Sequence, residues 1–250
     1  MRLEGTTIVV TGAANGLGRA MAGGFVREGA DVVAVDVDEA ALAEAVAGFE
    51  GAGRALAVVA DVGSPADVRS AAARSRRAFG PIDVLVSNAG VKQLTVTGDE
   101  RPTWAVPAET WETVLRTNLS GAFHWTRAVV PAMLDRGTGR VVLVTSGHGL
   151  RARARRAPYV ASKFGLEGLH RTLARELDDT GVDALAFTPP GGGVRTREAE
   201  FVEDPASMAH DPSVVVEPAV RLASGEGANG ERYRGSSDGA GLELTRAELD

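Results

Sequence analysis

Short apolar runs alternate along the chain with longer amphipathic segments, and each apolar run has about the length of one strand. Such alternation is typical of a parallel sheet with helices on both faces, because its strands are buried on both sides. The predicted strands are 6–11, 31–36, 54–60, 82–87, 140–146, 182–188 and 231–234. The predicted helices are 17–28, 39–49, 66–79, 108–135, 158–179 and 214–224. We expect an α/β fold with one doubly wound parallel sheet of about seven strands.

A glycine-rich turn joins the first predicted strand to the first predicted helix. Thr11-Gly12-Ala13-Ala14-Asn15-Gly16-Leu17-Gly18 follows the apolar run at 7–10 and opens the helix. Glycines let the backbone turn tightly and approach a pyrophosphate, whose charge then lies at the positive end of the helix. In this strand–turn–helix context the motif predicts a Rossmann-type dinucleotide site. The predicted cofactor contacts in the turn are Gly12, Asn15, Gly16, Leu17 and Gly18.

An acidic residue, Asp36, ends the second predicted strand. A carboxylate at this place accepts hydrogen bonds from the hydroxyls of the adenosine ribose, and its charge repels the 2′-phosphate of NADP. Val37 follows it and Asn15 lies in the glycine turn, so neither position offers a cation to that phosphate. Arg19 is the nearest basic residue. We therefore expect NAD to be preferred over NADP.

The carboxyl ends of two further strands carry residues suited to a cofactor, because open α/β sheets bind ligands at that edge. Asp61 and Val62 follow the third strand, where they either border the adenine or cap the helix that begins after Pro65. Small residues at 87–90 end the fourth strand and would let the cofactor pass closely, although taken alone they are better explained by an ordinary turn. The predicted contacts in that turn are Asn88, Ala89 and Gly90.

A tyrosine and a lysine four residues apart open the helix after the fifth strand, which ends in Ser146. Tyr159 and Lys163 therefore share one face of that helix. A tyrosine hydroxyl with a pKa near ~10 exchanges protons poorly at neutral pH, whereas a nearby ammonium favours the phenolate. Ser146 would hydrogen-bond the substrate oxygen that gains or loses the proton. Each residue alone is explained by ordinary packing, but their convergence with a dinucleotide turn favours catalysis.

In order and spacing these motifs resemble those of the short-chain dehydrogenase/reductase family, over roughly residues 5–224. The resemblance implies hydride transfer between a secondary alcohol or ketone and the nicotinamide C4. It implies that Lys163 also binds the nicotinamide ribose and that Asn118 helps to hold a water in a proton relay. The implied catalytic tetrad is Asn118, Ser146, Tyr159 and Lys163. The implied cofactor contacts after the sixth strand are Pro190, Gly191 and Thr196.

Four features depart from the family's usual pattern. Ser87 stands where many relatives have another asparagine, and an extra glycine at 191–193 leaves the register of Thr196 open. The last predicted strand is unusually charged, and charges on an edge strand discourage pairing with a second edge. Four arginines also crowd the loop between Ser146 and Tyr159. They are Arg151, Arg153, Arg155 and Arg156.

Two interpretations of this arginine loop stand side by side. The arginines either recognise a carboxylate or phosphate on the substrate, or they form a solvated loop or salt bridges to acidic groups of a neighbouring subunit. The second interpretation is favoured, because surface charges usually contribute little energy. Asn118 lies inside the predicted helix 108–135. An asparagine there usually points to solvent or bends the helix, and we expect one of the two here.

Composition narrows the function further. A chain of 250 residues with 44% hydrophobic content fits one large α/β domain over residues 1–250. The net charge of −6 gives no reason to expect a nucleic-acid partner. The absence of cysteine excludes disulfides and thiolate metal sites, and no metal is expected. The first strand begins too early for a signal peptide, and no apolar run approaches the ~20 residues of a membrane span. We expect a cytoplasmic protein without a membrane partner.

The leading hypothesis is an NAD-dependent oxidoreductase that interconverts a small secondary alcohol and its ketone, with Tyr159 as general acid and base. A 3-oxoacyl thioester reductase is the alternative, which the NAD-type ribose site disfavours because reductive biosynthesis commonly uses NADPH. A non-catalytic dinucleotide-binding regulator is a further alternative, although such proteins typically lack one of the four site residues. The segment 91–107, the arginine loop and a substrate lid near 191–212 would select the substrate.

A homo-oligomer, either dimer or tetramer, is expected from the family resemblance. The helices at 108–135 and 158–179 would form the interface. The first of them carries more aromatic residues than one helix face needs to bury internally. These aromatic residues are Trp111, Phe123 and Trp125.

Overall fold

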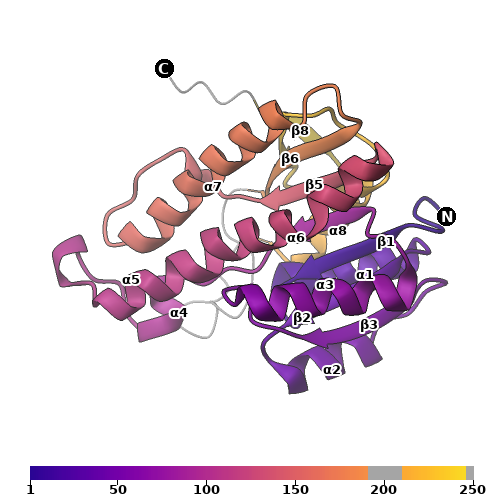
Figure 1. Cartoon of the computed structure of the whole chain (residues 1–250). Coiled ribbons are helices and arrows are strands. Elements are labelled where there is room, and N and C mark those ends of the chain that lie inside the picture. The colour runs from indigo at the N-terminus through magenta and orange to yellow at the C-terminus, as the bar shows by residue number, and fades with distance from the viewer. Residues whose placement is uncertain (191–209, 246–250) are drawn as a thin grey trace.

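Figure 1 shows the computed structural model of the chain, which describes residues 1–190 and 210–245. The strands are β1 Thr7–Thr11, β2 Asp31–Asp36, β3 Arg54–Val59, β4 Val84–Ser87, β5 Gly139–Val144, β6 Val182–Thr188, β7 Arg232–Gly235 and β8 Leu242–Leu244. The α-helices are α1 Gly16–Arg27, α2 Glu39–Ala47, α3 Pro65–Phe79, α4 Gln93–Thr97, α5 Ala108–Leu115, α6 Gly121–Arg136, α7 Ala157–Glu176 and α8 Val216–Ala223. Of the predicted lid near 191–212, residues 191–209 lie outside the described part of the chain.

The described strands form one sheet in the order β3-β2-β1-β4-β5-β6-β7-β8. Strands β1 to β7 are parallel, and β8 runs antiparallel to β7. In the middle of the sheet, Val9 of β1 pairs with Val33 of β2 and with Leu85 of β4. The strand order reverses between β1 and β4, which is where such sheets bind dinucleotides. The doubly wound parallel sheet is confirmed, with eight strands in place of about seven.

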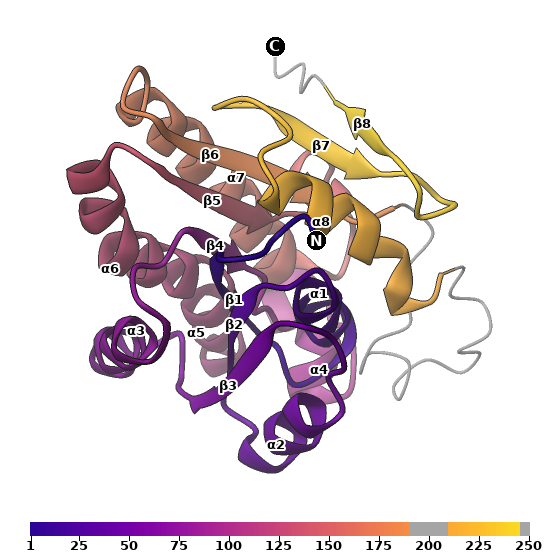
Figure 2. The same cartoon turned by 90° about the vertical axis from the view of Figure 1, so that its right-hand side faces the viewer.

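Helices cover both faces of the sheet, as the two views in Figures 1 and 2 show. One core lies between the sheet and helices α1, α2 and α8, and it includes Phe25 and Phe187. The other lies between the sheet and helices α3, α6 and α7, and it includes Trp125. Along β1 the side chains alternate between these cores, with Val10 in the first and Val9 in the second. Burial on both faces explains why β1 is a continuous apolar run.

The predicted helix 108–135 is observed as three consecutive segments. α5 ends at Leu115, a π-turn spans Arg116–Ser120, and α6 begins at Gly121. A π-turn adds one residue to a helical turn and so changes which side chains face the interior. Trp125 is fully buried, which corrects the expectation that it adds aromatic surface for an interface. Trp111 and Phe123 are 39% and 49% exposed and do present such surface.

Strand β7 carries its charge inside the protein. The Arg232 guanidinium is buried and donates from Nε to Glu167 Oε1 on α7, at 3.0 Å. It also donates to Thr188 Oγ1 at 2.8 Å and to Thr245 Oγ1 at 3.0 Å. Because β8 pairs with β7, the charged strand is not the sheet edge that the sequence analysis assumed. The charge of Arg232 is therefore directed into the protein and not along an open sheet edge.

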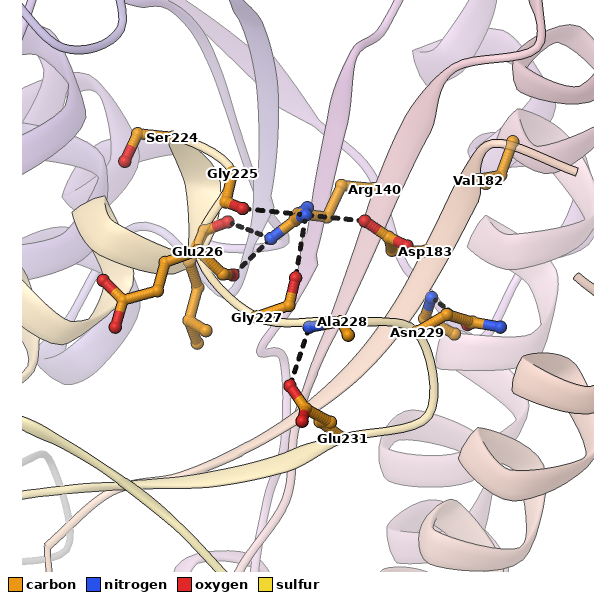
Figure 3. Close-up of polar contacts among 12 residues, drawn as sticks. Arg140, Val182, Asp183, Ser224, Gly225, Glu226, Gly227, Ala228, Asn229 and Glu231 are labelled. Atoms are coloured by element: carbon orange, nitrogen blue, oxygen red, sulfur yellow. Dashed lines mark hydrogen bonds and ion pairs between the residues drawn. The ribbon is translucent and has the colours of Figure 1, made fainter. Parts of the chain in front are cut away.

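The side chain of Arg140 on β5 forms hydrogen bonds with the segment after α8, as Figure 3 shows. Its guanidinium donates to the carbonyls of Leu222 at 2.9 Å and of Gly225 and Gly227 at 3.3 Å, and to the Glu226 carbonyl. It also pairs with Asp183 of β6 at 2.6 Å. Carbonyls at and beyond a helix C-terminus lack partners within the helix. Here the Arg140 side chain donates to several of these carbonyls and so holds α8 against the sheet.

Candidate active site

The glycine turn after β1 has the shape that a phosphate-binding turn requires. Gly12 and Gly16 have φ values of +67° and +51°, which side-chain-bearing residues rarely adopt. A Cβ at Gly18 would lie 2.0 Å from the carbonyl oxygen of Gly12, so only glycine allows the turn to close onto α1. Asn15 stands at the N-cap without a side-chain cap bond. The unpaired N–H groups of the first turn of α1 therefore suit a pyrophosphate.

Thr11 and Asn88 join this turn to the end of β4. The Thr11 hydroxyl accepts hydrogen bonds from the backbone N–H groups of Asn88 and Ala89, each at 3.0 Å. The Asn88 side chain donates to the carbonyls of Thr11 at 2.9 Å and Gly12 at 3.2 Å. A Cβ at Gly12 would lie 2.8 Å from the Ala89 Cα. The segment 87–90 therefore packs directly against the glycine turn, and Gly90 is exposed.

The Asp36 carboxylate lies at the end of β2 and faces the same turn. Its Oδ2 accepts from the Ala14 N–H at 3.0 Å, and its Oδ1 accepts from the Val37 N–H at 2.8 Å. Each carboxylate oxygen keeps further acceptor capacity, and the residue is partly exposed. Arg19 is engaged elsewhere, in an ion pair with Glu44 at 3.2 Å. These contacts hold the Asp36 carboxylate beside the glycine turn.

Asp61 and Val62 follow β3, and neither caps α3. The N-cap of α3 is Ser64, whose hydroxyl accepts from the Asp67 N–H at 3.3 Å. Asp61 pairs instead with Arg116 of the π-turn at 2.5 Å, and Val62 is buried. The capping alternative for this pair is therefore wrong. The pair lies at the carboxyl end of β3, where its predicted contact with the adenine stays a prediction.

Asn118 is buried, so of its two expected behaviours exposure to solvent is wrong, and it lies in the π-turn that interrupts the helix. Its side chain forms a reciprocal pair with Val91, accepting from the Val91 N–H at 2.7 Å and donating to the Val91 carbonyl at 2.9 Å. It also donates to Ser162 Oγ at 3.0 Å, and that hydroxyl donates to the Tyr159 carbonyl at 2.8 Å. The π-turn directs the amide inwards. Asn118 thus connects the segment after β4 with the first turn of α7.

Lys163 is buried beneath Tyr159. Its Nζ donates to the carbonyl of Val144, the last residue of β5, at 2.9 Å. The ammonium lies 5.7 Å from the centre of the Tyr159 ring. Burial, together with the Lys92 ammonium, lowers the pKa of Lys163 to about 8, against the raising effect of the Glu167 carboxylate. The lysine stays charged at neutral pH but titrates close to it.

Ser146 and Tyr159 border one short turn. Ser146 begins the 3₁₀ turn Gly147–Gly149, and its hydroxyl accepts from the His148 N–H at 3.2 Å. The His148 ring packs edge-on against Tyr159, with 5.9 Å between ring centres and an angle of 75°. Pro158 lies in the first turn of α7 and Tyr159 follows it, so the helix start holds the tyrosine beside the end of β5. Both Ser146 and Tyr159 are partly exposed.

Of the remaining predicted cofactor contacts, only Pro190 and Leu17 lie in the described part of the chain. Pro190 is buried two residues beyond that strand, and Leu17 is partly buried in the first turn of α1. Gly191 and Thr196 lie outside the described residues. Within those residues, no cluster of three His, Cys, Asp or Glu could hold a metal ion. The same residues include no helix that is long and apolar enough to cross a membrane.

The arginine loop divides into two parts. Arg151, Arg153 and Arg155 are exposed, whereas Arg156 is partly buried and pairs with Glu100 at 2.6 Å. Arg155 adopts a φ of +62°, which a long side chain rarely takes. The described contacts thus include an ion pair within the chain itself, which neither interpretation of the loop considered.

Four residues that shape the site were missed by the sequence analysis. Thr11 and Ser162 lie inside the two motifs, but motif spacing does not reveal the hydrogen bonds that they form. Lys92 follows the turn after β4, and its Nζ lies 5.4 Å from the centre of the Tyr159 ring. His148 follows Ser146 by two residues. The available signal for the last two was a lysine next to the Asn-Ala-Gly turn and a histidine next to Ser146.

Comparison with known proteins agrees with this geometry. The chain matches the short chain dehydrogenase family over residues 6–204. It is 38% identical over 189 residues to the 2-dehydro-3-deoxy-L-rhamnonate dehydrogenase (NAD(+)) of Sphingomonas sp. (strain SKA58), which covers 75% of this chain and 72% of that protein. It is 33% identical over 190 residues to the 3-oxoacyl-(acyl-carrier-protein) reductase FabG of Escherichia coli (strain K12), which covers 76% of this chain and 74% of that protein.

Among solved structures, the crystal structure of levodione reductase superimposes with a TM-score of 0.84 at 26% identity. The match covers 95% of this chain and 98% of that one. The family match spans well over half of the chain and includes the glycine turn, Ser146, Tyr159 and Lys163. The chain therefore belongs to the short-chain dehydrogenase/reductase family and is an NAD(P)-dependent oxidoreductase that acts on a CH–OH group.

Proposed function

We propose that this protein is an NAD-dependent oxidoreductase that interconverts a small secondary alcohol and its ketone. One observation carries the proposal. The buried Lys163 ammonium lies beside the Tyr159 ring and bonds to the last residue of β5. It is therefore at the carboxyl ends of the strands, where the glycine turn after β1 also lies. A proton-transferring tyrosine and a dinucleotide-binding turn at one edge are what hydride transfer to or from a CH–OH carbon needs.

The cofactor fits the residues that the structure describes. The glycine turn closes onto α1 in a way that a Cβ at Gly18 would prevent, the N-terminus of α1 has N–H groups without partners in the helix, and Asp36 offers a carboxylate. When bound, the nicotinamide ring supplies or accepts the hydride. We propose that it is held through the residues predicted above, with Lys163 and Tyr159 at the nicotinamide ribose.

The protein's own part is proton transfer and positioning. During oxidation Tyr159, as phenolate, takes the alcohol proton, and during reduction it returns a proton to the carbonyl oxygen. The Lys163 ammonium stabilises the phenolate, and the Ser146 hydroxyl hydrogen-bonds the same substrate oxygen. Asn118 fixes the backbone at Val91 and the first turn of α7, which sets the position of Tyr159.

We propose NAD over NADP because the Asp36 charge faces the ribose position and Arg19 is paired with Glu44. The alternative function, reduction of a 3-oxoacyl thioester, is supported by the 33% identity to the Escherichia coli reductase. Activity on a short 3-oxoacyl thioester with each nicotinamide cofactor separates the two. The name of the Sphingomonas relative gives a sugar acid, 2-dehydro-3-deoxy-L-rhamnonate, as its substrate, so we include hydroxy acids with neutral alcohols as candidate substrates.

We further propose that the protein works in the cytoplasm as a homo-oligomer built through α5, α6 and α7. Exposed aromatic side chains on these helices support the assembly. They are Trp111, Phe123 and Phe164, of which the least exposed is 38% exposed.

A screen of secondary alcohols and ketones of graded size tests the function directly. NADH absorbance at each substrate is compared between the parent protein and Tyr159→Phe. We expect the parent to turn over at least one CH–OH compound, and the turnover rate of the variant to be at least ~10²-fold lower. Equal rates in the two proteins would remove Tyr159 from the reaction.

A further inference from the structure

A groove with a basic lining runs between helices α3 and α6, which lie side by side in both views (Figures 1 and 2). Its volume is about 310 Å³, which falls within the ~300–1,000 Å³ of pockets that hold small molecules. Arg69 and Arg76 of α3 and Arg127 of α6 line it, and no acidic side chain of the described residues does. This basic lining contrasts with the net charge of −6 of the whole chain.

Helical spacing brings these arginines to one groove. Arg69 and Arg76 are seven residues apart, so they share the face of α3 that also carries Ala72. On α6, Arg127 and its neighbour Ala128 belong to the face opposite. Alanine side chains occupy little volume between two packed helices. The alanines thus leave the groove open beneath longer side chains that extend to solvent.

The arginines of the groove keep most of their hydrogen-bond donors available. Arg69 and Arg127 are exposed, and neither forms a hydrogen bond or an ion pair with another residue in the described part of the chain. Arg76 makes one long hydrogen bond, from Nη1 to the Ala128 carbonyl at 3.5 Å. A guanidinium group has five N–H donors, so Arg76 also retains donors for a ligand.

The groove adjoins the carboxyl end of β3 without including the glycine turn. His124 of α6 lines it and donates from Nδ1 to the carbonyl of Val62 at 3.0 Å. The acidic residues on either side of this segment are engaged: Asp61 pairs with Arg116 at 2.5 Å, and Asp67 accepts from the Asp61 N–H at 3.2 Å. No residue of the glycine turn lines the groove. An anion bound there would therefore occupy a place other than the pyrophosphate position.

We propose that this groove binds a small organic phosphate. A guanidinium group binds phosphate through two parallel N–H donors, and donors from two helices can together reach all three free oxygens of a phosphate ester. A phosphate ester carries a charge of about −1.5 to −2 at pH 7, so it offsets the repulsion among three guanidinium groups more fully than a carboxylate does. Ala72 and Ala128 offer apolar contacts to the organic part. The inference concerns binding alone and does not rest on the proposed reaction.

Calorimetric titration in the presence of saturating NADH tests the proposal, because NADH then occupies the dinucleotide site. The probes are phenyl phosphate, inorganic phosphate, benzoate and phenol. Phenyl phosphate should bind the parent protein, and inorganic phosphate and benzoate should bind at least ~10-fold more weakly, since one lacks the apolar part and the other lacks the third oxygen. Phenol should show no binding. Absence of phenyl phosphate binding, or equal affinity for inorganic phosphate or benzoate, would overturn the inference.

Variants of the lining arginines place the binding in this groove. Arg69→Gln combined with Arg127→Gln should weaken phenyl phosphate binding at least ~10-fold, the lower end of the range for hydrogen bonds to a charged group. Arg127→Gln alone should give an intermediate affinity. Arg74→Gln is the matched control, because Arg74 is an exposed arginine of α3 that does not line the groove. It should bind phenyl phosphate as the parent does.

The affinity for NADH should be the same in the parent and all three variants, which shows that the fold and the dinucleotide site are intact. Phenyl phosphate affinity that is unchanged in the double variant would overturn the inference. An equal loss in Arg74→Gln and Arg127→Gln would also overturn it, because binding would then reflect diffuse attraction to α3 and α6. Neither measurement requires turnover, so a failure of the proposed function leaves this test unaffected.

Discussion

The buried charge of Lys163 destabilises the folded protein. Its side chain is 4% exposed, and burial followed by the charge of Lys92 lowers its pKa from 10.5 to about 8. At pH 7 the folded protein therefore keeps a charged lysine in its interior. A shift of this size corresponds to about 3 kcal/mol of lost stability, since each pKa unit is worth about 1.4 kcal/mol. The Glu167 carboxylate opposes the shift.

Lys163→Met should therefore yield a more stable protein without useful catalysis. Below pH 8 the lysine is protonated in both states, and the cost of burying its charge is fully present. Between pH 8 and 10.5 the unfolded chain holds the proton while the folded protein does not, so the parent gains stability as pH rises. We expect the variant to exceed the parent by up to about 3 kcal/mol at pH 7 and by little at pH 10.5. Urea unfolding at both pH values measures this, and a pH-independent difference would contradict the buried charge.

Tyr159→Phe removes only a hydroxyl from the site. The ring keeps its contacts with His148 and Lys163, and the glycine turn and Asp36 are untouched. We expect turnover to fall by ~10²–10⁴-fold, the usual contribution of a general acid–base group. The dissociation constant of NADH, followed by its fluorescence, should change less than about threefold, which is well under 1 kcal/mol. Loss of NADH binding together with turnover would instead assign Tyr159 a structural role.

Residue identities were predictable where a motif fixes both the residue type and its spacing. The glycine turn and the Tyr-x3-Lys pair are of this kind, because backbone conformation and helical period determine them. Asn118 was predictable as a site residue only by resemblance, and of the two behaviours expected of it exposure to solvent was wrong. Its burial depends on a π-turn and on partners at Val91 and Ser162, which are distant in sequence. Local pattern carries no information about such partners.

The ion pair between α7 and β7 links two elements that the sequence alone does not bring together. Glu167 and Arg232 are 2% and 5% exposed, and Arg232 also bonds to Thr188 and Thr245. One Glu167 oxygen, Oε2, has no hydrogen-bond partner among the described residues. Removing one member of a buried pair leaves the other as an uncompensated charge, which typically costs 3–5 kcal/mol, by order of magnitude.

Arg232→Met should therefore destabilise the protein by roughly 3–5 kcal/mol, measured by urea unfolding at pH 7. The double variant Glu167→Leu with Arg232→Met should recover most of that loss, because both charges are then absent from the interior. Arg54→Met is the control, since Arg54 pairs with Asp31 at 2.6 Å on the surface. It should cost less than about 1 kcal/mol. A double variant no more stable than the single one would show that packing, not charge, makes the difference.

At the scale of elements, long and strongly patterned segments were predictable and short ones were not. Seven strands lie within a few residues of their expected positions, because runs buried on both faces are almost continuously apolar. β8 has three residues and α4 has five, too few to show a period. The division of 108–135 was missed because a single inserted residue in a helix hardly changes its apolar spacing.

Cofactor choice is a property of the whole nucleotide-facing edge of the molecule. Asp36 contributes a fixed negative charge, and the pairing of Arg19 with Glu44 keeps the nearest cation occupied. We expect kcat/KM with NAD to exceed that with NADP by at least ~10-fold, since like charges about 4 Å apart cost ~1–4 kcal/mol. Asp36→Asn should narrow this ratio, mainly by improving KM for NADP. Comparable values for both cofactors in the parent would show the assignment to be wrong.

Assembly is the last property to test, and it concerns the outer face of the layer formed by α5, α6 and α7. Phe123 and Trp111 are 49% and 39% exposed on α6 and α5, whereas Trp125 is buried and adds nothing to this surface. Placing a charge there forces an interface to bury it without a partner, so Phe123→Glu should convert the oligomer to a monomer. Val59→Glu is the matched control, because Val59 is also 49% exposed but lies on β3, the strand at one edge of the sheet. Light scattering at micromolar concentration should show an oligomer for the parent and the control and half that mass or less for Phe123→Glu. A monomeric parent would end the proposal, and an oligomeric Phe123→Glu would place the interface on another face.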